Sequence, residues 1–357
     1  MPTVHQVLLA DFPAERIGLL KPSALGDIVH ALPVLTALRR RFPVAHITWI
    51  VNRSYEPLLR GHPHLDDVLS FNRRLFRQGL WNGVHELAAF HSALRRKRFD
   101  LLVDLQGLLR SGLIARASGA ARRVGLSTAR EGAAWFYTDM LPVEDVRTIH
   151  AVDRYWLVAQ ALGVGDLPKQ FIFPTLGDER HWALAKLADW PRPWLAISLG
   201  TRWETKRWPA EHFTALARRA LSIVGGTIVL VGGRDEQQWS SMLSAQLTGA
   251  VCDLTGQTTL PQLVAVLRET DAMIANDSGP LHVAVALGKP VVAPYTCTSQ
   301  IQTGPYGQAQ GAVATKVWCA ASYLKHCKRM DCMKELTPDR VWPALEQILR
   351  QCQRRSA

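Results

Sequence analysis

The chain has 357 residues, more than a single hydrophobic core usually organises, so two domains are expected. Its 48% hydrophobic and 20% charged residues are typical of a globular protein, and no apolar run reaches the roughly 18 to 20 residues of a membrane-spanning helix. The net charge of +12 favours a polyanionic partner, such as nucleic acid, anionic lipid or a phosphorylated substrate.

The opening residues, MPTVHQVLLADFPAER, lack a basic stretch followed by a long apolar one. No signal peptide is therefore expected, and the protein is expected in the cytoplasm. Six cysteines in a chain of this length do not indicate a disulfide-rich scaffold, which agrees with a reducing compartment.

Short apolar runs alternate with helical patterns in the first half of the chain, which is typical of parallel α/β sheets. The strands are expected at 17–20, 46–51, 68–71 and 101–104, with a further candidate at 122–125. The helices are expected at 27–41, 83–97 and 150–162.

A stretch rich in Gly and Pro, residues 164–178, predicts the boundary between the two domains. The alternation then restarts, with strands expected at 194–199, 227–231, 251–254, 272–276 and 291–295. The helices of this half are expected at 209–222, 235–247, 259–269 and 279–288. A last helix should begin at Pro338, which suits a first helical position.

The most informative segment is IANDSGPLHVAVALGKP, residues 274–290. A strand should end at Asn276 and a helix begin near Gly279, which places backbone N–H groups and the positive end of a helix dipole where a phosphate can bind. Ser278 can donate a hydroxyl, and His282 lies on the same helix face as Gly279. The structural alternative is a plain helix cap followed by a partly buried core histidine.

Two further loops follow expected strands of the same sheet. Thr201 and Lys206 lie in ISLGTRWETKRWPAEHF, and Glu236 lies in VGGRDEQQ. Ligands of open α/β sheets bind at the carboxyl ends of the strands, so these loops should converge on a site for a nucleotide diphosphate. Individually, the lysine could be a solvated charge and the glutamate an ordinary acid at a helix start. No Walker lysine pattern and no GxGxxG follows a strand.

In the first half, Asp27 lies at the junction between an expected strand and an expected helix, in the segment KPSALGDIVHALPVLTALRRRFP. A carboxylate at that position can cap the helix. It can also take a proton from a hydroxyl within about 3 Å as a general base. The pattern allows both roles.

These segments, together with DLQGLLRSGLIAR and STAREGAAWFY, resemble glycosyltransferase family 9, the ADP-heptose:lipopolysaccharide heptosyltransferases. The resemblance runs from about residue 16 to about residue 350, and STAREGA is closer to the enzymes that add the first heptose (heptosyltransferase I) than to those that add the second. It implies a GT-B fold of two Rossmann-like α/β domains that face each other across a cleft. The expected parts are an acceptor-binding domain at 1–170, a nucleotide-sugar domain at 171–335 and a final helix at 336–357 that packs back on the first domain.

The resemblance also implies roles for individual residues. Asp27 is similar to the catalytic carboxylate of the family. The residues that resemble its donor contacts are Thr201, Lys206, Glu236, Thr258, Asp277, Ser278, Gly279 and His282, with Asp277 expected at the heptose hydroxyls. The acceptor would be bound by cations and polar groups at strand ends of the first domain, namely Ser23, Arg60, Arg110 and Arg130.

By this resemblance, the expected enzyme is an inverting glycosyltransferase that moves heptose from ADP-L-glycero-D-manno-heptose to Kdo on lipid A. It would need no cofactor, release ADP, and dock peripherally on the anionic inner face of the inner membrane. Alternatives are a family 9 enzyme with another nucleotide sugar or acceptor, and a basic nucleic-acid-binding protein. The second lacks a basic stripe with interleaved aromatics, so no nucleic-acid partner is expected.

Three cysteines lie close together in the sequence at positions 319, 327 and 332. Their spacings of seven and four intervening residues do not match the CxxC of a typical zinc ribbon. With His326 or Cys297 they could form a four-ligand site, but free thiols are the expected state, and no metal site is predicted.

Overall fold

The computed structural model describes residues 8–72 and 80–356, so the start of the segment in which no signal peptide was expected lies outside the described residues. The chain divides into two compact units, Met1–Thr175 and Leu176–Ala357. No helix within the described ranges is both long and apolar enough to cross a membrane.

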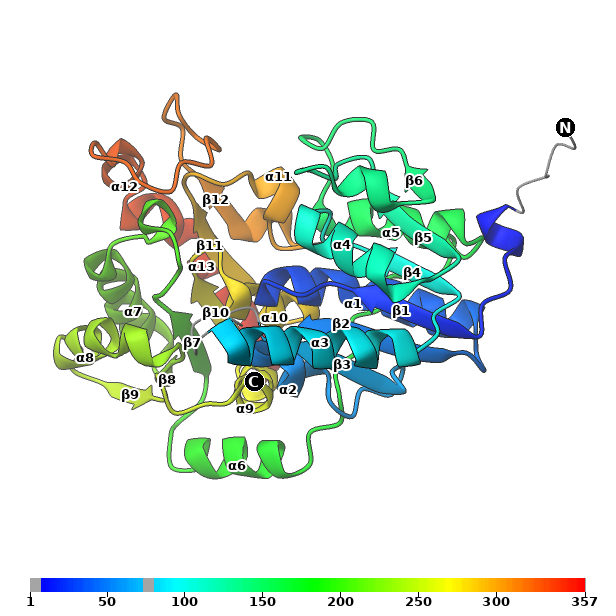
Figure 1. Ribbon diagram of the computed structural model, residues 1–357. Coiled ribbons are helices and arrows are strands. Elements are labelled where there is room, and N and C mark those ends of the chain that lie inside the picture. Colours follow the sequence, from blue (N-terminus) through cyan, green and yellow to red (C-terminus); the bar gives the residue numbers. More distant parts are fainter. Residues whose placement is uncertain (1–7, 73–79, 357) are drawn as a thin grey trace, which may run out of the picture. The chain divides into compact units, whose positions relative to one another are not determined.

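Unit 1 is built on a six-stranded sheet in which every strand pair is parallel (Figure 1). The strand order is β3-β2-β1-β4-β5-β6, the order of a dinucleotide-binding Rossmann domain. The strands are β1 (Arg16–Leu20), β2 (His46–Asn52), β3 (Asp67–Phe71), β4 (Leu101–Asp104), β5 (Arg122–Leu126) and β6 (Asp139–Leu141). The helices are α1 (Leu25–Arg41), α2 (Glu56–Leu59), α3 (Leu80–Arg96), α4 (Leu109–Ser118) and α5 (Ala151–Ala161).

Unit 2 repeats this topology with a second parallel sheet, in the order β12-β11-β10-β7-β8-β9. Its strands are β7 (Trp194–Ser198), β8 (Thr227–Leu230), β9 (Ala250–Asp253), β10 (Ala272–Ala275), β11 (Val291–Tyr295) and β12 (Ala312–Ala314). Its helices are α6 (Asp178–Leu187), α7 (Ala210–Val224), α8 (Gln237–Ala245), α9 (Leu260–Glu269), α10 (Gly279–Ala286), α11 (Gln300–Thr303), α12 (Asp331–Glu335) and α13 (Pro338–Ser356). The two Rossmann-like domains expected from the sequence are therefore present.

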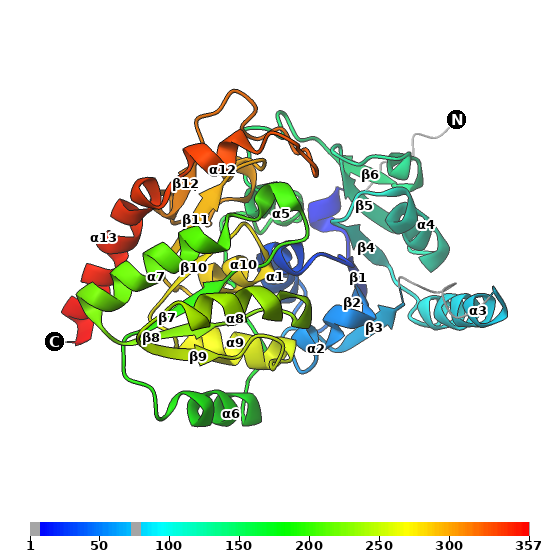
Figure 2. The same ribbon diagram turned by 90° about the vertical axis from the view of Figure 1, so that its left-hand side faces the viewer.

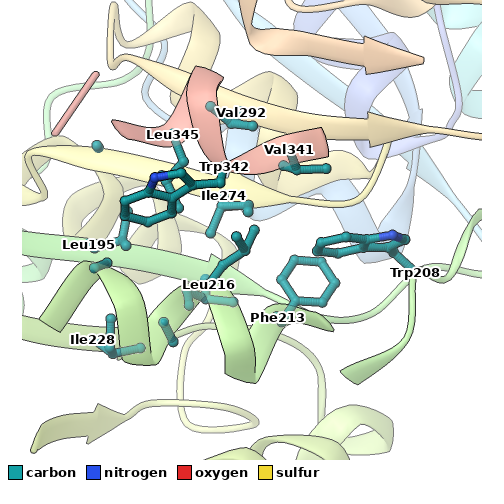
Figure 3. Packing of buried hydrophobic residues seen from close by; sticks show 14 of the residues in the cluster. Leu195, Trp208, Phe213, Leu216, Ile228, Ile274, Val292, Val341, Trp342 and Leu345 are labelled. Carbon is teal, nitrogen blue, oxygen red and sulfur yellow. The ribbon is translucent and has the colours of Figure 1, made fainter. Parts of the chain in front are cut away.

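The central strands are buried along their whole length and mostly apolar, because helices cover both sheet faces. Every residue of β7, β8, β10 and β11 is buried. Figure 3 shows the resulting core of unit 2, in which Trp208 and Phe213 pack beside Leu216 and Ile274. Trp208 donates its indole N–H to the carbonyl of Leu336 at 2.7 Å, so this tryptophan serves the core.

The last helix, α13, begins at Pro338 as predicted and lies alongside α7 (Figure 2). Its apolar stripe, which includes Val341 and Leu345, belongs to the same core as α7, β10 and β11. A helix at 336–357 was expected to pack back on the first domain, whereas the apolar stripe of α13 lies in the core of unit 2.

Candidate functional site

In unit 2, three loops with polar residues leave neighbouring strands at the carboxyl edge of the sheet. Strand β7 lies between β8 and β10 and is hydrogen-bonded to both. The loop after β7 carries Lys206, the loop after β8 carries Glu236, and the loop after β10 carries Asp277. The sheet topology therefore brings together the three loops that the sequence singled out.

Asp277 is the centre of a buried polar network, with an exposed fraction of 4%. Its Oδ2 lies 2.6 Å from Nζ of Lys206 and accepts a hydrogen bond from Thr298 Oγ1 at 2.7 Å. Its Oδ1 lies 3.2 Å from Nε2 of His282, and Thr303 Oγ1 lies 3.5 Å from Oδ2. Lys206 also donates to the backbone carbonyl of Asp277 at 3.1 Å.

These partners decide the charge state of the carboxylate. Burial alone would raise the pKa of Asp277, but the hydrogen bond from His282 and the charge of Lys206 outweigh burial and lower that pKa well below its ordinary value. Burial, and after it the negative charge of Asp277, raises the pKa of the neighbouring Tyr295 hydroxyl. Asp277 is therefore an ionised group whose two oxygens already have protein partners. Its expected contact with the heptose hydroxyls stays a prediction.

The start of helix α10 lies directly beside this network. Ser278 is its N-cap residue, Gly279 its first residue, and Pro280 stands in the first turn. The Ser278 hydroxyl oxygen is shielded from solvent and has no hydrogen-bond partner within the described part of the chain. An unsatisfied donor beside free helix N–H groups fits an anionic ligand.

Glu236 occupies a space that only glycines leave open. Its Oε2 accepts a hydrogen bond from the Gly200 N–H at 3.1 Å. A Cβ on Gly200 would lie 1.9 Å from the Glu236 carboxyl carbon, and one on Gly232 would lie 2.2 Å from Oε2. Partial burial raises the pKa of Glu236. The carboxylate is thus held between the loops that follow β7 and β8.

The two remaining donor candidates lie in loops of unit 2. Thr201 is half-buried, and its backbone carbonyl accepts a hydrogen bond from Arg207 at 2.9 Å. Thr258 is half-buried and immediately precedes Thr259, the N-cap of α9. Both stand in loops that follow strands of the sheet, which the sequence predicted for Thr201.

In unit 1, Asp27 closes the first turn of α1 and still reaches solvent. Helix α1 begins at Leu25, two residues before the expected start, with Ala24 as its N-cap residue. Asp27 is the third helical residue, and its Oδ2 caps the helix by accepting a hydrogen bond from the Ala24 N–H at 2.9 Å. Its Oδ1 lies 3.4 Å from the Tyr155 hydroxyl and 3.9 Å from Nζ of Lys21. The side chain of Asp27 is 42% exposed, which leaves the carboxylate accessible to a further hydroxyl group.

Lys21 is the buried partner of this carboxylate. Burial alone would lower the pKa of Lys21, but Asp27 and Tyr155 outweigh burial and raise it. The Lys21 ammonium also lies 5.1 Å from the centre of the Tyr155 ring and donates to the Leu105 carbonyl at 3.2 Å. A permanently charged lysine thus stands behind an accessible carboxylate.

The acceptor candidates are spread over several loops of unit 1. Ser23 lies in the loop that leads into α1, and Arg60 follows α2 and pairs with Glu56 at 2.6 Å. Arg110 is exposed in the first turn of α4. The backbone N–H of Arg130 donates to Gly107 at 2.8 Å, which joins the loops after β4 and β5. Arg110, in the helix turn that follows the β4 loop, and Arg130, in the β5 loop, therefore belong to adjoining segments, whereas Arg60 has an acidic partner of its own.

Sequence reasoning missed Tyr155, Thr298 and Thr303. Tyr155 is 128 residues away from Asp27, and Thr298 is 21 residues from Asp277. Thr298 follows β11, whose carboxyl end lies next to that of β10. The rule that ligands bind at the carboxyl ends of the strands, applied also to β11, would have found Thr298. Nothing in the sequence around Tyr155 indicates its contact with Asp27.

The cysteines do not form a recognisable metal centre. All six are free thiols, and within residues 8–72 and 80–356 no group of three or more His, Cys, Asp or Glu side chains is placed to hold a metal ion. Burial raises the pKa of Cys332, and the thiols at 297, 319 and 327 add to this effect.

Comparisons with known proteins place these observations in a family. The model of glycosyltransferase family 9 (heptosyltransferase) matches residues 87–333. The sequence is 32% identical to lipopolysaccharide heptosyltransferase 1 of Pseudomonas aeruginosa over 94% of this chain and 98% of that protein. It is 28% identical to lipopolysaccharide heptosyltransferase 2 of Escherichia coli, over 81% and 85% of the two chains.

Solved structures show the same architecture. The structure of E. coli heptosyltransferase WaaC with ADP superposes with a TM-score of 0.73 at 26% identity, covering 93% of this chain and 99% of the other. A family 9 glycosyltransferase from Veillonella parvula gives a TM-score of 0.79 at 24% identity, covering 94% and 97%. The expected GT-B fold is thereby confirmed. With its paired Rossmann-like units, a polar network at the strand ends of unit 2 and similarity along nearly its whole length, this chain belongs to glycosyltransferase family 9 and is an enzyme of the heptosyltransferase type.

Proposed function

We propose that this enzyme transfers L-glycero-D-manno-heptose from its ADP-activated form to Kdo in the inner core of lipopolysaccharide, with inversion at the anomeric carbon. The similarity to a heptosyltransferase 1 over 94% of the chain supports this substrate pair. The ADP named with the related E. coli structure supports an adenine nucleotide donor. The observation that carries the proposal is the Lys206–Asp277 pair beside the start of α10, which suits a diphosphate.

In this proposal unit 2 binds the donor. The Lys206 ammonium and the N–H groups at the start of α10 neutralise the diphosphate, and the Ser278 hydroxyl finds its missing partner on a phosphate oxygen. Glu236 accepts hydrogen bonds from the ribose hydroxyls. Asp277 positions Lys206 and meets the heptose on the side of Thr303, where its hydrogen bond is longest.

Unit 1 supplies the acceptor side and the general base. The acceptor hydroxyl oxygen forms a bond to the anomeric carbon while the bond from that carbon to the diphosphate oxygen breaks. The hydroxyl proton passes to Asp27, and ADP leaves with the electron pair. Attack on the face opposite the leaving group inverts the configuration. The cations Arg110 and Arg130 fit the carboxylates and phosphates of a Kdo–lipid A acceptor.

We propose that protein groups alone balance the charge of the leaving ADP, because Lys206 and the α10 terminus already provide cationic partners at one place. Transfer is then expected to persist unchanged after dialysis against EDTA. A loss of rate that Mg²⁺ or Mn²⁺ restores would contradict this part of the proposal.

The enzyme is also expected to work in the cytoplasm, peripherally on the anionic inner face of the inner membrane, because the acceptor is lipid-linked and the net charge is +12. The substrate assignment is tested by offering ADP-, UDP- and GDP-activated sugars with a Kdo-containing acceptor and detecting products by mass spectrometry. The expected result is a product in which heptose from ADP-heptose is linked to a hydroxyl group of Kdo. Transfer only from a UDP- or GDP-sugar would refute the donor, and transfer only to acceptors without Kdo would refute the acceptor.

A further inference from the structure

The surface of unit 2 carries a segment with an unusual combination of charge and exposed apolar groups. It spans residues 316–329, between β12 and α12, and Figure 1 draws it in orange. Four cations and no carboxylate occur in this segment, KVWCAASYLKHCKR. The cations are Lys316, Lys325, Lys328 and Arg329, and all four are exposed.

Two large apolar side chains of this segment are left in water. Trp318 is 85% exposed and Leu324 is 54% exposed. Exposed apolar groups forgo the stabilisation of burial, although single cases are common on protein surfaces. Here Trp318 and Leu324 lie within seven positions of each other and among cations. Protein surfaces that bind a lipid head-group layer have this composition.

Hydrogen bonds hold the backbone of the segment in a defined conformation. Thr205 donates its hydroxyl to the Leu324 carbonyl at 2.6 Å. The Tyr323 N–H donates to Cys297 at 2.7 Å, and the Ala321 N–H donates to Thr296 at 3.2 Å. The outward position of the apolar groups is therefore built into the fold of unit 2.

The segment also contacts the turn that carries Lys206. Glu204 accepts a hydrogen bond from the Cys327 N–H at 3.2 Å and lies 3.4 Å from His326. The Lys325 ammonium lies 5.4 Å from the centre of the Trp203 ring. A surface that docks through this segment would thus adjoin the loop after β7 on the same unit.

We propose that residues 316–329 form the contact of unit 2 with an anionic lipid bilayer. Trp318 and Leu324 enter the boundary between head groups and acyl chains, and Lys316, Lys325 and Lys328 pair with lipid phosphates, whereas Arg329 already pairs with Asp331 at 2.7 Å. A bilayer matches both features at once, because it offers an apolar layer beneath a dense negative one. This inference deepens the proposed peripheral location of the enzyme and rests on that part of the proposed function only.

The test is co-sedimentation of the full-length protein with large vesicles at physiological salt. One set contains phosphatidylcholine with about 30% phosphatidylglycerol, which is anionic, and the other set contains phosphatidylcholine alone. The wild type should bind only the anionic vesicles. Trp318→Ala and the double variant K316E/K328E should each lower the partition coefficient by about tenfold or more.

Two control variants match these changes elsewhere on unit 2. Met242→Ala removes an apolar side chain that is 55% exposed on α8. R218E/R268E alters the net charge as much as K316E/K328E does, at exposed positions on α7 and α9. Both controls should bind the anionic vesicles within about twofold of wild type, and ADP affinity should be unchanged in all four variants.

Three results would overturn the inference. The first is wild-type binding of anionic vesicles that neither segment variant weakens, which would leave the peripheral location standing but place the docking surface elsewhere. The second is an equal loss in R218E/R268E, which would make the effect one of net charge. The third is any result that refutes the membrane as partner. One such result is that the wild type binds neither set of vesicles. The other is that K316E/K328E loses binding to a DNA oligonucleotide while its binding to vesicles is unchanged.

Discussion

At the scale of single residues, Asp27 has an observed capping role and a proposed catalytic role, which a substitution can separate. One carboxylate oxygen caps α1 at 2.9 Å from the Ala24 N–H, while the other faces Tyr155 and Lys21. The capping role belongs to folding and contributes about 1 kcal/mol to stability. The proposed role as general base belongs to turnover and should contribute much more to the rate.

Asp27→Asn is therefore expected to lower kcat by about 10² to 10⁴, because the amide cannot take the proton of the attacking hydroxyl. The dissociation constant of ADP, measured by calorimetry, should stay within about twofold, since the nucleotide is proposed to bind on unit 2. Urea unfolding gives the capping contribution independently. Near-normal turnover with weakened ADP binding would contradict the assignment.

The second residue-scale prediction concerns the buried pair of Lys206 and Asp277. Because the pKa of Asp277 is lowered by folding, its charge stabilises the protein above the unfolded pKa of about 3.9, and this stabilisation is lost as the pH falls toward the folded pKa. Lys206→Met leaves the carboxylate buried with fewer partners. It should lower the free energy of unfolding at pH 7 by about 3 kcal/mol.

The matched control for this prediction is the double variant K206M/D277N, which removes both charges. It should recover part of the lost stability, and its stability should depend less on pH between 5 and 2 than that of the wild type. Neither variant should bind ADP tightly. Equal stability of Lys206→Met and wild type in urea unfolding at pH 7 would show that the ion pair is not held as the structure places it.

At the scale of elements, the strand positions could be predicted because buried parallel strands read as short apolar runs. Residues 101–104 are a strand in both the prediction and the structure, and the strand expected at 272–276 ends one residue earlier, at Ala275. Strands β6 and β12 were missed because three residues are too few to show a period. Helix α6 was missed because its start falls in the Gly- and Pro-rich stretch.

The site followed the same logic. Donor candidates at the ends of β7, β8 and β10 could be predicted because parallel topology fixes where strand ends meet. Contacts such as that of Tyr155 with Asp27 join elements far apart in the chain, and no local pattern encodes them. The stripe of α13 indicates that one face is buried, but not what covers it.

Helix α13 gives an element-scale prediction because its stripe lies in the core of unit 2. Leu345 is fully buried there among residues of α7 and the sheet. Leu345→Ala should cost about 2 to 5 kcal/mol of stability through lost burial and a residual cavity. Gln347→Ala, at an exposed position of the same helix, should stay within about 0.5 kcal/mol.

Thermal unfolding with and without ADP measures this effect. If α13 stabilises unit 2, added ADP should raise the midpoint of the same transition that Leu345→Ala lowers, because ligand and helix stabilise one unit. A loss confined to a transition that ADP does not shift would indicate that the helix stabilises unit 1 instead.

At the scale of the whole molecule, two units of equal topology are proposed to divide the substrates between them. Each unit has its own core and its own polar groups at the carboxyl edge of its sheet. If unit 2 binds the nucleotide sugar and unit 1 the acceptor, substitutions should separate by substrate. With such a division, a substitution in unit 2 should change KM for the nucleotide sugar, and a substitution in unit 1 should change KM for the acceptor.

Glu236→Gln removes the charge that is proposed to hold the ribose, so it should raise KM for ADP-heptose about tenfold and leave KM for the acceptor within twofold. The pair R110S/R130S removes two exposed cations of unit 1, and it should raise KM for the Kdo-containing acceptor at least tenfold with little effect on the donor. Steady-state kinetics with each substrate varied in turn measures both effects.

Because salt screens exposed charges, the effect of R110S/R130S on KM should shrink as ionic strength rises, whereas the effect of changing the half-buried Glu236 should change less. If both variants raise the two KM values alike, the proposed division of substrates between the units is wrong.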